Sequence, residues 1–355
     1  MSFQEVPNLP FMFKRDNVAR YEDGHVFILD RRIYPFEIEF VHCKIYEDTA
    51  KAIEDMVTQS GGPGTAAGFG MVQAAHQYAD RSGKAMLTAL RNAADRLIAT
   101  RPTNNHTKLV VNHMYAVAED ATSKSINIES RLLDEMDRMF EERQIFGLAL
   151  GEAAATVIKD GDTILNHCWA ESGIIYTLYV AIKQGKKLKA YCSETRPYLQ
   201  GARLTADAIS DLGVPTTIIT DGMSAHLMSQ GKIDSFFAGA DRITMDGHVI
   251  NKIGTLTHAV CAHNFNIPFY AFCFGPDKEA PTPDNVIIEE RNPEEVLHCL
   301  GKRTGTPKAK GYYPAFDITP PKFVSGIITD KGVYSPYTLE DYYKDTDPTM
   351  SKRFI

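Results

Sequence analysis

Residues 163–255 alternate short apolar segments with segments of helical spacing. This repeated order predicts a parallel β-sheet covered by helices on both faces, the doubly wound, Rossmann-like arrangement. Three of the apolar segments are followed at once by polar residues, namely Cys168, the run 193–197 and Asp241. Because ligands bind just beyond the carboxyl ends of the strands in such a sheet, we expect these side chains to face one crevice.

The chain before this stretch has a different pattern. Residues 26–29 and 33–41 alternate like strands, and residues 30–32 between them predict a hairpin turn. Helical spacing then recurs, at 50–57, 85–100 and 125–143. We therefore predict a mainly helical N-terminal domain with a small β-hairpin over residues 1–145. A C-terminal Rossmann-like catalytic domain is predicted over residues 146–355, so the whole chain belongs to the α/β class.

Composition limits the classes of partner. The net charge of −7 does not favour binding to nucleic acid or to an anionic membrane. Residues 1–20 lack the apolar core of a signal peptide, and no apolar run is long enough to span a bilayer. The six cysteines are scattered and form no C-x-x-C pair, a pattern typical of reduced thiols and not of a zinc site. We expect a cytoplasmic enzyme without metal or cofactor.

Two residues at strand ends suit acid–base chemistry. Cys168 lies where a strand gives way to a helix, and the helix dipole at such a position can lower the pKa of a thiol. Asp241 follows another strand, and an apolar pocket there would raise the pKa of its carboxyl group. The plainer interpretations are a small buried residue for Cys168 and a helix cap or a partner of Arg242 for Asp241. His167 is expected to point away from Cys168, as neighbours on a strand do, so no Cys–His pair is predicted.

Several further residues could hold an anion. The glycine-rich run Ser60–Gly61–Gly62 precedes a helix, and backbone N–H groups at such a place can bind phosphate. Basic side chains that could join it include Arg101, Arg196 and Lys252. On spacing alone, a tight turn is the better interpretation of the glycine-rich run, and an ion pair with Glu194 is the plain alternative for Arg196.

Longer motifs make the interpretation specific. Residues 194–197 read E-T-R-P, residues 239–243 read G-A-D-R-I and residues 251–255 read N-K-I-G-T. With these motifs the chain resembles the methylthioribose-1-phosphate isomerase family. That family is grouped with ribose-1,5-bisphosphate isomerase and with the regulatory subunits of the eukaryotic initiation-factor nucleotide exchanger. The resemblance extends over nearly the whole chain and includes residues 101–103, 200–206, 288–296 and 314–320.

The resemblance implies an isomerase that converts an aldose 1-phosphate into a ketose 1-phosphate without a cofactor. The catalytic cysteine and aspartate of the family correspond to Cys168 and Asp241. In the implied mechanism, Asp241 protonates the ring oxygen to open the sugar. Cys168 then moves a proton from C2 to C1, or a hydride shifts between these carbons. A homodimer and a place in methionine salvage follow by the same analogy. The family's sugar-phosphate contacts correspond to Ser60, Gly61, Gly62, Arg101, Gln200, Asn251 and Lys252.

Three departures from the family pattern predict a different substrate, and one of them is a segment after Pro63 that is about two residues shorter than in the family. Ser60 stands where the family has an arginine, so one phosphate-binding charge is missing. Trp169 stands where the family has an asparagine beside the catalytic cysteine, and Glu171 adds a negative charge nearby. With Arg196, these residues are the predicted determinants of specificity. We therefore expect a paralogue that acts on another pentose phosphate, such as ribose 1,5-bisphosphate or a 5-deoxypentose 1-phosphate.

Two alternatives to an enzyme remain open on the sequence. One is a non-catalytic sensor of a sugar phosphate or nucleotide, like the exchanger subunits. The other is a module that binds a partner protein through the acidic helix at residues 125–143. The presence of both Cys168 and Asp241 favours the enzyme, because a sensor needs no acid–base pair.

Overall fold

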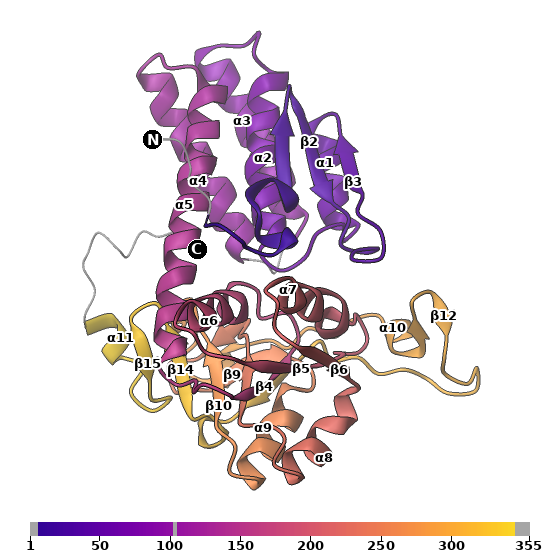
Figure 1. The fold of residues 1–355 in the computed structure, drawn as a ribbon. Coiled ribbons are helices and arrows are strands. Elements are labelled where there is room, and N and C mark those ends of the chain that lie inside the picture. The colour runs from indigo at the N-terminus through magenta and orange to yellow at the C-terminus, as the bar shows by residue number, and fades with distance from the viewer. Residues whose placement is uncertain (1–5, 102–104, 345–355) are drawn as a thin grey trace. The chain divides into compact units, whose positions relative to one another are not determined.

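The computed structural model describes residues 6–101 and 105–344, and within them the chain forms two compact units (Figure 1). The N-terminal unit ends at Ile145 and the C-terminal unit begins at Phe146. This division lies inside one continuous helix, α5 (Ile128–Ala155). No helix in the described ranges is both long enough and apolar enough to cross a bilayer.

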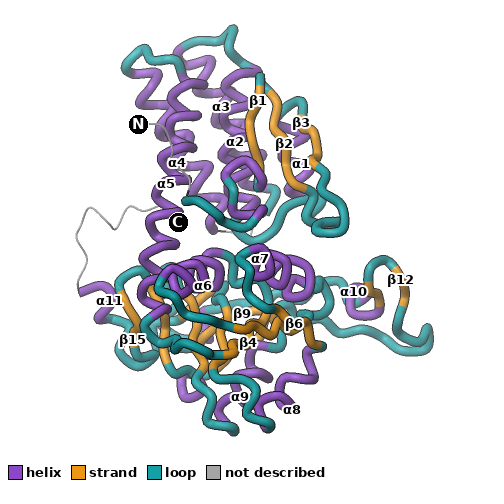
Figure 2. Tube along the Cα trace, in the orientation of Figure 1, coloured by secondary structure: helices purple, strands orange, loops and turns teal. Residues whose placement is uncertain are grey.

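The N-terminal unit combines helices with a three-stranded antiparallel sheet, as Figure 2 shows by colour. Helix α2 is its centre, because every residue from Gly62 to Ala75 is buried. The many glycines and alanines of α2 let α1, α3 and α4 pack against it. The elements in chain order are η1 (Phe11–Phe13), η2 (Arg15–Asn17), β1 (Ala19–Glu22), β2 (His25–Leu29), β3 (Phe40–Cys43), α1 (Tyr46–Glu54), α2 (Gly62–Gln77), α3 (Gly83–Ala99), α4 (Asn105–Ser123) and the first part of α5.

The predicted helical domain with a hairpin is confirmed, but the predicted hairpin turn at residues 30–32 is wrong. The turn is formed by Asp23 and Gly24, which join β1 to β2 with φ angles of 47° and 84°. An Asp-Gly pair with two positive φ angles suits the twist of a two-residue hairpin, so this signal was present in the sequence. Residues 30–39 instead form a longer connection from β2 to β3.

Helix α4 was missed from the sequence. Its buried residues Val110, Val111, Met114, Val117 and Ala118 have helical spacing, so the apolar signal was there. The helix lies directly after residues 102–104, which are not described.

The C-terminal unit contains a seven-stranded sheet with the order β15-β14-β10-β7-β4-β5-β6. All neighbouring strands are parallel except β14 and β15. Taken in chain order, the six parallel strands follow the doubly wound arrangement, in which the chain reverses direction between β4 and β7. The predicted parallel sheet is therefore confirmed. The strands are β4 (Thr163–His167), β5 (Lys189–Ser193), β6 (Thr216–Ile219), β7 (Ser235–Ala238), β10 (Phe269–Phe272), β14 (Gly326–Thr329) and β15 (Gly332–Tyr334).

Helices cover both faces of this sheet. Figure 1 shows α6 (Ser172–Lys183) and α7 (Ala206–Asp211) on one face, and α8 (Ser224–Ser229) and α9 (Thr255–Asn264) on the other. Helix α7 continues a π-helical segment, η3 (Gly201–Thr205). Further elements of the unit, apart from a second small sheet, are η4 (Asp221–Met223), η5 (Pro283–Asn285), α10 (Glu294–Leu297), β11 (His298–Cys299), β12 (Lys302–Arg303), η6 (Pro321–Phe323) and α11 (Asp341–Lys344).

The C-terminal unit also contains a second, small antiparallel sheet. It consists of β8 (Arg242–Ile243), β9 (Val249–Lys252) and β13 (Phe316–Thr319), with β9 in the middle. Residues 251 and 252 of the N-K-I-G-T motif end strand β9. Helix α9 starts three residues later, after Gly254, whose φ of 105° turns the chain.

Gly151 provides a test of how closely α5 and α6 pack within the C-terminal unit. A Cβ atom at Gly151 would lie 2.5 Å from the carbonyl oxygen of Tyr176 in α6. Although alanine is the better helix former, we expect Gly151→Ala to lower the free energy of unfolding by about 1–3 kcal/mol, because the helix backbones would have to move apart.

The matched control is Gly222→Ala. A Cβ atom there meets no atom within 4 Å, so this variant should be neutral or slightly stabilising. Urea unfolding followed by the fluorescence of Trp169 measures both variants. Equal unfolding midpoints for the two would contradict the close approach of α5 and α6.

Candidate active site

Cys168 follows strand β4 in a backbone conformation that is rare for a side-chain-bearing residue. Its φ is 64°, in the left-handed region. Two hydroxyl groups hold it there. The Cys168 N–H donates to Thr195 Oγ1 at 2.9 Å, and Thr205 Oγ1 donates to the Cys168 carbonyl oxygen at 2.6 Å. The strand end is therefore fixed by residues from β5's loop and from η3, and the thiol is buried.

Asp241 follows strand β7, the neighbour of β4. His167 at the end of β4 pairs in register with Ala238 at the end of β7, so both strands stop at the same level. The Asp241 N–H donates to Ile250 of β9 at 3.0 Å, which fixes the start of the small sheet. Cys168 and Asp241 thus follow the two strands between which the strand order reverses, where open α/β sheets bind ligands.

The charge of Asp241 acts on the thiol of Cys168, and Lys252 acts on both groups. Lys252 is buried at the end of β9, with its ammonium group 4.6 Å from the ring centre of Phe316. Arg291 and Glu289 form an ion pair at 3.0 Å, and the charges of both also act on Asp241. The structure therefore brings the predicted residues Cys168, Asp241 and Lys252 into one electrostatic cluster within the C-terminal unit.

Burial changes the protonation of this cluster. It raises the pKa of the Cys168 thiol to about 11, although the ammonium group of Lys252 opposes the rise. The expected lowering by a helix dipole is therefore wrong, because desolvation outweighs it. Desolvation also raises the pKa of Asp241, as predicted for a general acid.

As a residue, Asp241 is nevertheless exposed to solvent, so the expected dry surroundings hold fully only for Cys168. A raised pKa and an exposed residue are compatible when protein atoms surround most of the carboxyl group and water still reaches part of the residue. The raised pKa of Asp241 then reflects partial and not complete loss of hydration. Arg242 pairs with Asp277 at 3.1 Å, so the plainer interpretation of Asp241 as a partner of Arg242 has no support.

Several buried polar atoms of the C-terminal unit have no hydrogen-bond partner among the described residues, and three of them belong to residues near the predicted site. These three are Ser172 Oγ, Gln200 Oε1 and the hydroxyl oxygen of Tyr313. Buried polar groups are usually paired, so such atoms are available to a polar ligand. Gln200 is one of the predicted sugar-phosphate contacts. Asn251, another of them, donates through Nδ2 to Thr255 Oγ1 at 2.9 Å and keeps its carbonyl oxygen for other partners.

The predicted specificity residues have different surroundings. Trp169 is buried beside Cys168, the common fate of a tryptophan. Glu171 is half-buried and precedes α6 with a φ of 44°. The guanidinium group of Arg196 donates to the carbonyl oxygens of Val296 and His298 at 3.1 and 2.7 Å, and not to Glu194. Arg196 thus anchors the segment around α10.

The remaining predicted phosphate contacts belong to the N-terminal unit. Ser60 has a φ of 59° and Gly61 precedes α2, so the glycine-rich run does form the start of a helix. A Cβ atom at Gly62 would lie 1.9 Å from Thr58 Oγ1, so a larger residue does not fit there. The buried Arg31 donates to the Gln59 carbonyl oxygen at 2.8 Å. Arg101 contacts the sulfur of Met56.

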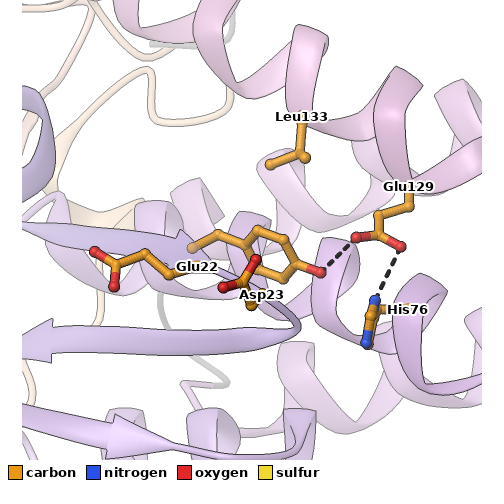
Figure 3. Close-up of a pocket in the computed structure, with 6 residues that line it drawn as sticks. Glu22, Asp23, His76, Glu129 and Leu133 are labelled. Atoms are coloured by element: carbon orange, nitrogen blue, oxygen red, sulfur yellow. Dashed lines mark hydrogen bonds and ion pairs between the residues drawn. The ribbon is translucent and has the colours of Figure 1, made fainter.

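The N-terminal unit also contains a pocket that does not include any predicted site residue (Figure 3). Glu129 accepts a hydrogen bond from the Tyr21 hydroxyl at 2.6 Å and lies 3.0 Å from His76 Nδ1. Glu22 and Asp23 add two more carboxylates to the lining. A phosphate would be repelled by this arrangement, so this pocket is not the sugar-phosphate site.

A second cluster of side chains, which the sequence did not reveal, includes His167, the residue before Cys168. One imidazole nitrogen each of His167 and His258 and a carboxylate oxygen of Asp221 lie within 4.8 Å of one another. A metal ion could be held at this spacing. These atoms are already engaged in hydrogen bonds. His167 Nε2 donates to the Ile253 carbonyl oxygen at 3.1 Å, and His258 Nδ1 lies 2.7 Å from Ser224 Oγ. Both oxygens of Asp221 accept backbone N–H groups at 2.8 Å. The donor set therefore fits a hydrogen-bonded network better than a metal site.

The histidines of this network predict a pH dependence of stability. Burial lowers the pKa of His167 to about 4 and that of His258 to about 3. When the pH falls below about 6.5, the unfolded chain takes up protons that the folded protein does not. The free energy of unfolding should therefore fall between about pH 6.5 and pH 4, by up to about 1.4 kcal/mol per pH unit for each histidine.

In His258→Gln this slope should be shallower than in the natural protein. His263→Gln, at an exposed position of α9, is the matched control for the loss of an imidazole. Urea unfolding at a series of pH values, followed by Trp169 fluorescence, gives the slopes. Identical slopes in the natural protein and in His258→Gln would show that His258 is not held neutral by burial.

Comparison with known proteins identifies the family of the chain. Residues 59–336 match the model of the Initiation factor 2 subunit family. Methylthioribose-1-phosphate isomerase 1 of Pseudothermotoga lettingae is 37% identical over 92% of this chain and 96% of its own length. A 5-deoxyribose 1-phosphate isomerase of Bacillus cereus is 35% identical over 90% of this chain and 95% of its own length.

A solved structure gives the same result. The crystal structure of 5-methylthioribose 1-phosphate isomerase from Pyrococcus horikoshii is 32% identical and superposes with a TM-score of 0.82. The match covers 98% of this chain and all of that one. On the family match and on these relatives, the chain belongs to the Initiation factor 2 subunit family and is similar to its sugar-phosphate isomerases.

Proposed function

We propose that this protein is an aldose–ketose isomerase that converts a pentose 1-phosphate into the corresponding ketose 1-phosphate. The observation that carries the proposal is the placement of Cys168 and Asp241 after the two strands between which the strand order reverses, where the charge of Asp241 acts on the thiol. Relatives over most of the chain are named as isomerases of this kind, and methylthioribose 1-phosphate is the nearest named substrate.

Asp241 is the proposed general acid. Its raised pKa makes the carboxyl group easier to protonate, and the protonated group can donate to the ring oxygen of the sugar. The bond between C1 and the ring oxygen then breaks, and the ring oxygen becomes a hydroxyl group. The carboxylate that remains can accept the proton of the C2 hydroxyl group as C2 becomes the ketone carbonyl. Its exposure to solvent lets the substrate reach it.

Cys168 has two possible roles in the transfer of hydrogen from C2 to C1. As a thiolate, it could remove a proton from C2 and return it to C1. As a neutral thiol, it could line the path of a hydride that passes directly between the carbons. In the ligand-free protein, burial raises the pKa of the Cys168 thiol to about 11, which favours the neutral thiol. A neutral thiol fits the hydride route better than the proton route.

Phosphate binding is proposed for Lys252, Gln200 and Asn251 in the C-terminal unit. Lys252 supplies a buried ammonium group, and Gln200 offers an acceptor without a partner among the described residues. Ser60, Gly61, Gly62 and Arg101 stay predicted contacts from the N-terminal unit. Arg31 places a guanidinium group beside the loop at Gln59.

The substrate's substituent at C5 has two candidates. The relatives named above act on methylthioribose 1-phosphate and on 5-deoxyribose 1-phosphate, at similar identities. Both names describe sugars without a second phosphate group. The carboxylate of Glu171, close to Cys168 in the chain, also disfavours a second phosphate group, because like charges repel. Ribose 1,5-bisphosphate is therefore the less favoured alternative. A non-catalytic sensor is disfavoured because Cys168 and Asp241 are both present.

The finer expectations also belong to this proposal. A homodimer, a cytoplasmic location and a place in methionine salvage rest on the resemblance to the isomerases and on their names. The absence of a cofactor from the proposed reaction follows from its chemistry, because hydrogen moves within one molecule and no net oxidation occurs.

Substitution of the two proposed catalytic residues tests the function. Asp241→Asn should lower turnover of methylthioribose 1-phosphate by at least about 100-fold, the usual contribution of a positioned acid or base, and Cys168→Ser should lower turnover as well. Formation of the ketose is followed by NMR, and folding by circular dichroism. Cys261→Ser, at a partly exposed cysteine of α9, is the matched control and should retain turnover. Near-normal rates in Asp241→Asn would reject its role as the acid.

Isotope transfer distinguishes the two hydrogen-transfer routes. With substrate labelled by deuterium at C2 and run in ordinary water, the hydride route predicts that the label is retained at C1 of the product. The same assay with methylthioribose 1-phosphate, 5-deoxyribose 1-phosphate and ribose 1,5-bisphosphate ranks the substrates by kcat/KM. Loss of the label to water would contradict the hydride route, and preference for the bisphosphate would contradict the repulsion expected from Glu171.

A further inference from the structure

The turn that carries Lys252 has its own hydrogen-bond framework. Thr255 Oγ1 donates to the Lys252 carbonyl oxygen at 2.7 Å and accepts the side-chain amide of Asn251 at 2.9 Å. This closes residues 251–255 into a compact unit between β9 and α9. The Lys252 ammonium group has no ion pair with a carboxylate among the described residues, so the position of this turn sets where its charge acts.

His167 attaches this turn to the end of strand β4. Since a carbonyl oxygen can only accept, His167 Nε2 carries the proton and donates it to the Ile253 carbonyl oxygen at 3.1 Å. The other ring nitrogen then accepts, and Ser193 Oγ lies 2.6 Å from it. Gly254 packs against the imidazole, because a Cβ atom there would lie 3.0 Å from the ring. His167 thus contacts the Lys252 turn directly and is the residue before Cys168.

Asp317 of β13 holds the same turn from the other side. Its carboxylate accepts the N–H of Gly254 at 2.7 Å and the N–H of Leu256 at 3.1 Å. These are orphan donors at the start of α9, where a negative charge is stabilised. Burial raises the pKa of Asp317 to about 6, so the carboxylate is ionised at pH 7. Asp317 is also paired in register with Asn251.

Resting on the function proposed above, we infer that His167 and Asp317 are positioning residues that hold the Lys252 turn against the end of strand β4. Neither side chain needs to touch the substrate. Through the turn, they fix the distance between the ammonium group of Lys252 and the thiol of Cys168. Neither residue is among the predicted site residues, and the hydrogen bonds of His167 with Ser193 and Ile253 explain why it forms no pair with the thiol.

Alkylation of Cys168 tests this inference without any substrate. Only the thiolate reacts, and Lys252 favours the thiolate, so displacement of the turn should slow the reaction. The rate with iodoacetamide is measured across a pH series on the full chain, with the Cys168 peptide quantified by mass spectrometry. We expect His167→Asn and Asp317→Asn to slow alkylation about tenfold for each unit by which the thiol pKa rises.

Two comparisons separate positioning from a general loss of structure. In His167→Gln the side-chain amide can reach the Ile253 carbonyl oxygen in place of Nε2, so this variant should recover most of the rate that His167→Asn loses. In a Lys252→Met background, the His167→Asn and Asp317→Asn substitutions should change the alkylation rate less than twofold, because the charge they position is gone. His263→Gln is the control for loss of an imidazole elsewhere and should keep the natural rate.

Two results would overturn the inference. One is an effect of His167→Asn that is as large in the Lys252→Met background as in the natural protein. The other is an unchanged alkylation profile in both His167→Asn and Asp317→Asn. These outcomes do not depend on turnover, so they are distinct from a failure of the isomerase proposal. If turnover is also measured, the positioning variants should raise KM for the sugar phosphate, since Lys252 is a proposed phosphate contact.

Discussion

The pairing of strands β4 and β7 is the constraint on which the site depends. The two strands are distant in sequence, yet they lie side by side and end at the same level, with His167 opposite Ala238. In a doubly wound sheet this is where the chain reverses direction, so no helix crosses over the strand ends there. Cys168 and Asp241 project from these ends, and the hydroxyl groups of Thr195 and Thr205 fix the backbone of Cys168.

Burial then determines the chemistry that these residues can perform. Loss of water makes the thiol harder to ionise and the carboxyl group easier to protonate, so both tend toward their neutral forms. Lys252 is the main opposing influence on both. A site of this kind suits the opening of a sugar ring by an acid and a hydrogen transfer that needs little charge separation.

Much of the fold was predictable because local signals and global arrangement agree. The apolar runs that end at Cys168 and before Asp241 have the length and flanking residues of buried parallel strands, and they became β4 and β7. The prediction failed where a turn signal was overlooked and where a strand forms only by pairing with a segment distant in sequence. Asp23–Gly24 was a readable hairpin turn, whereas the strand character of residues 249–252 depends on pairing with β13, more than sixty residues later.

The site itself was predictable in its members but not in its electrostatics. Residue patterns and family motifs named Cys168, Asp241 and Lys252, but the direction of the thiol pKa follows from burial, which a sequence does not show. The contacts of His167 and Asp317 with the Lys252 turn join three strands that are far apart in the chain. The most direct measurement of the central claim is a crystal structure of Asp241→Asn with a bound pentose 1-phosphate. The account predicts that C1, C2 and the ring oxygen lie between the sulfur of Cys168 and residue 241. A sugar bound away from either residue would contradict it.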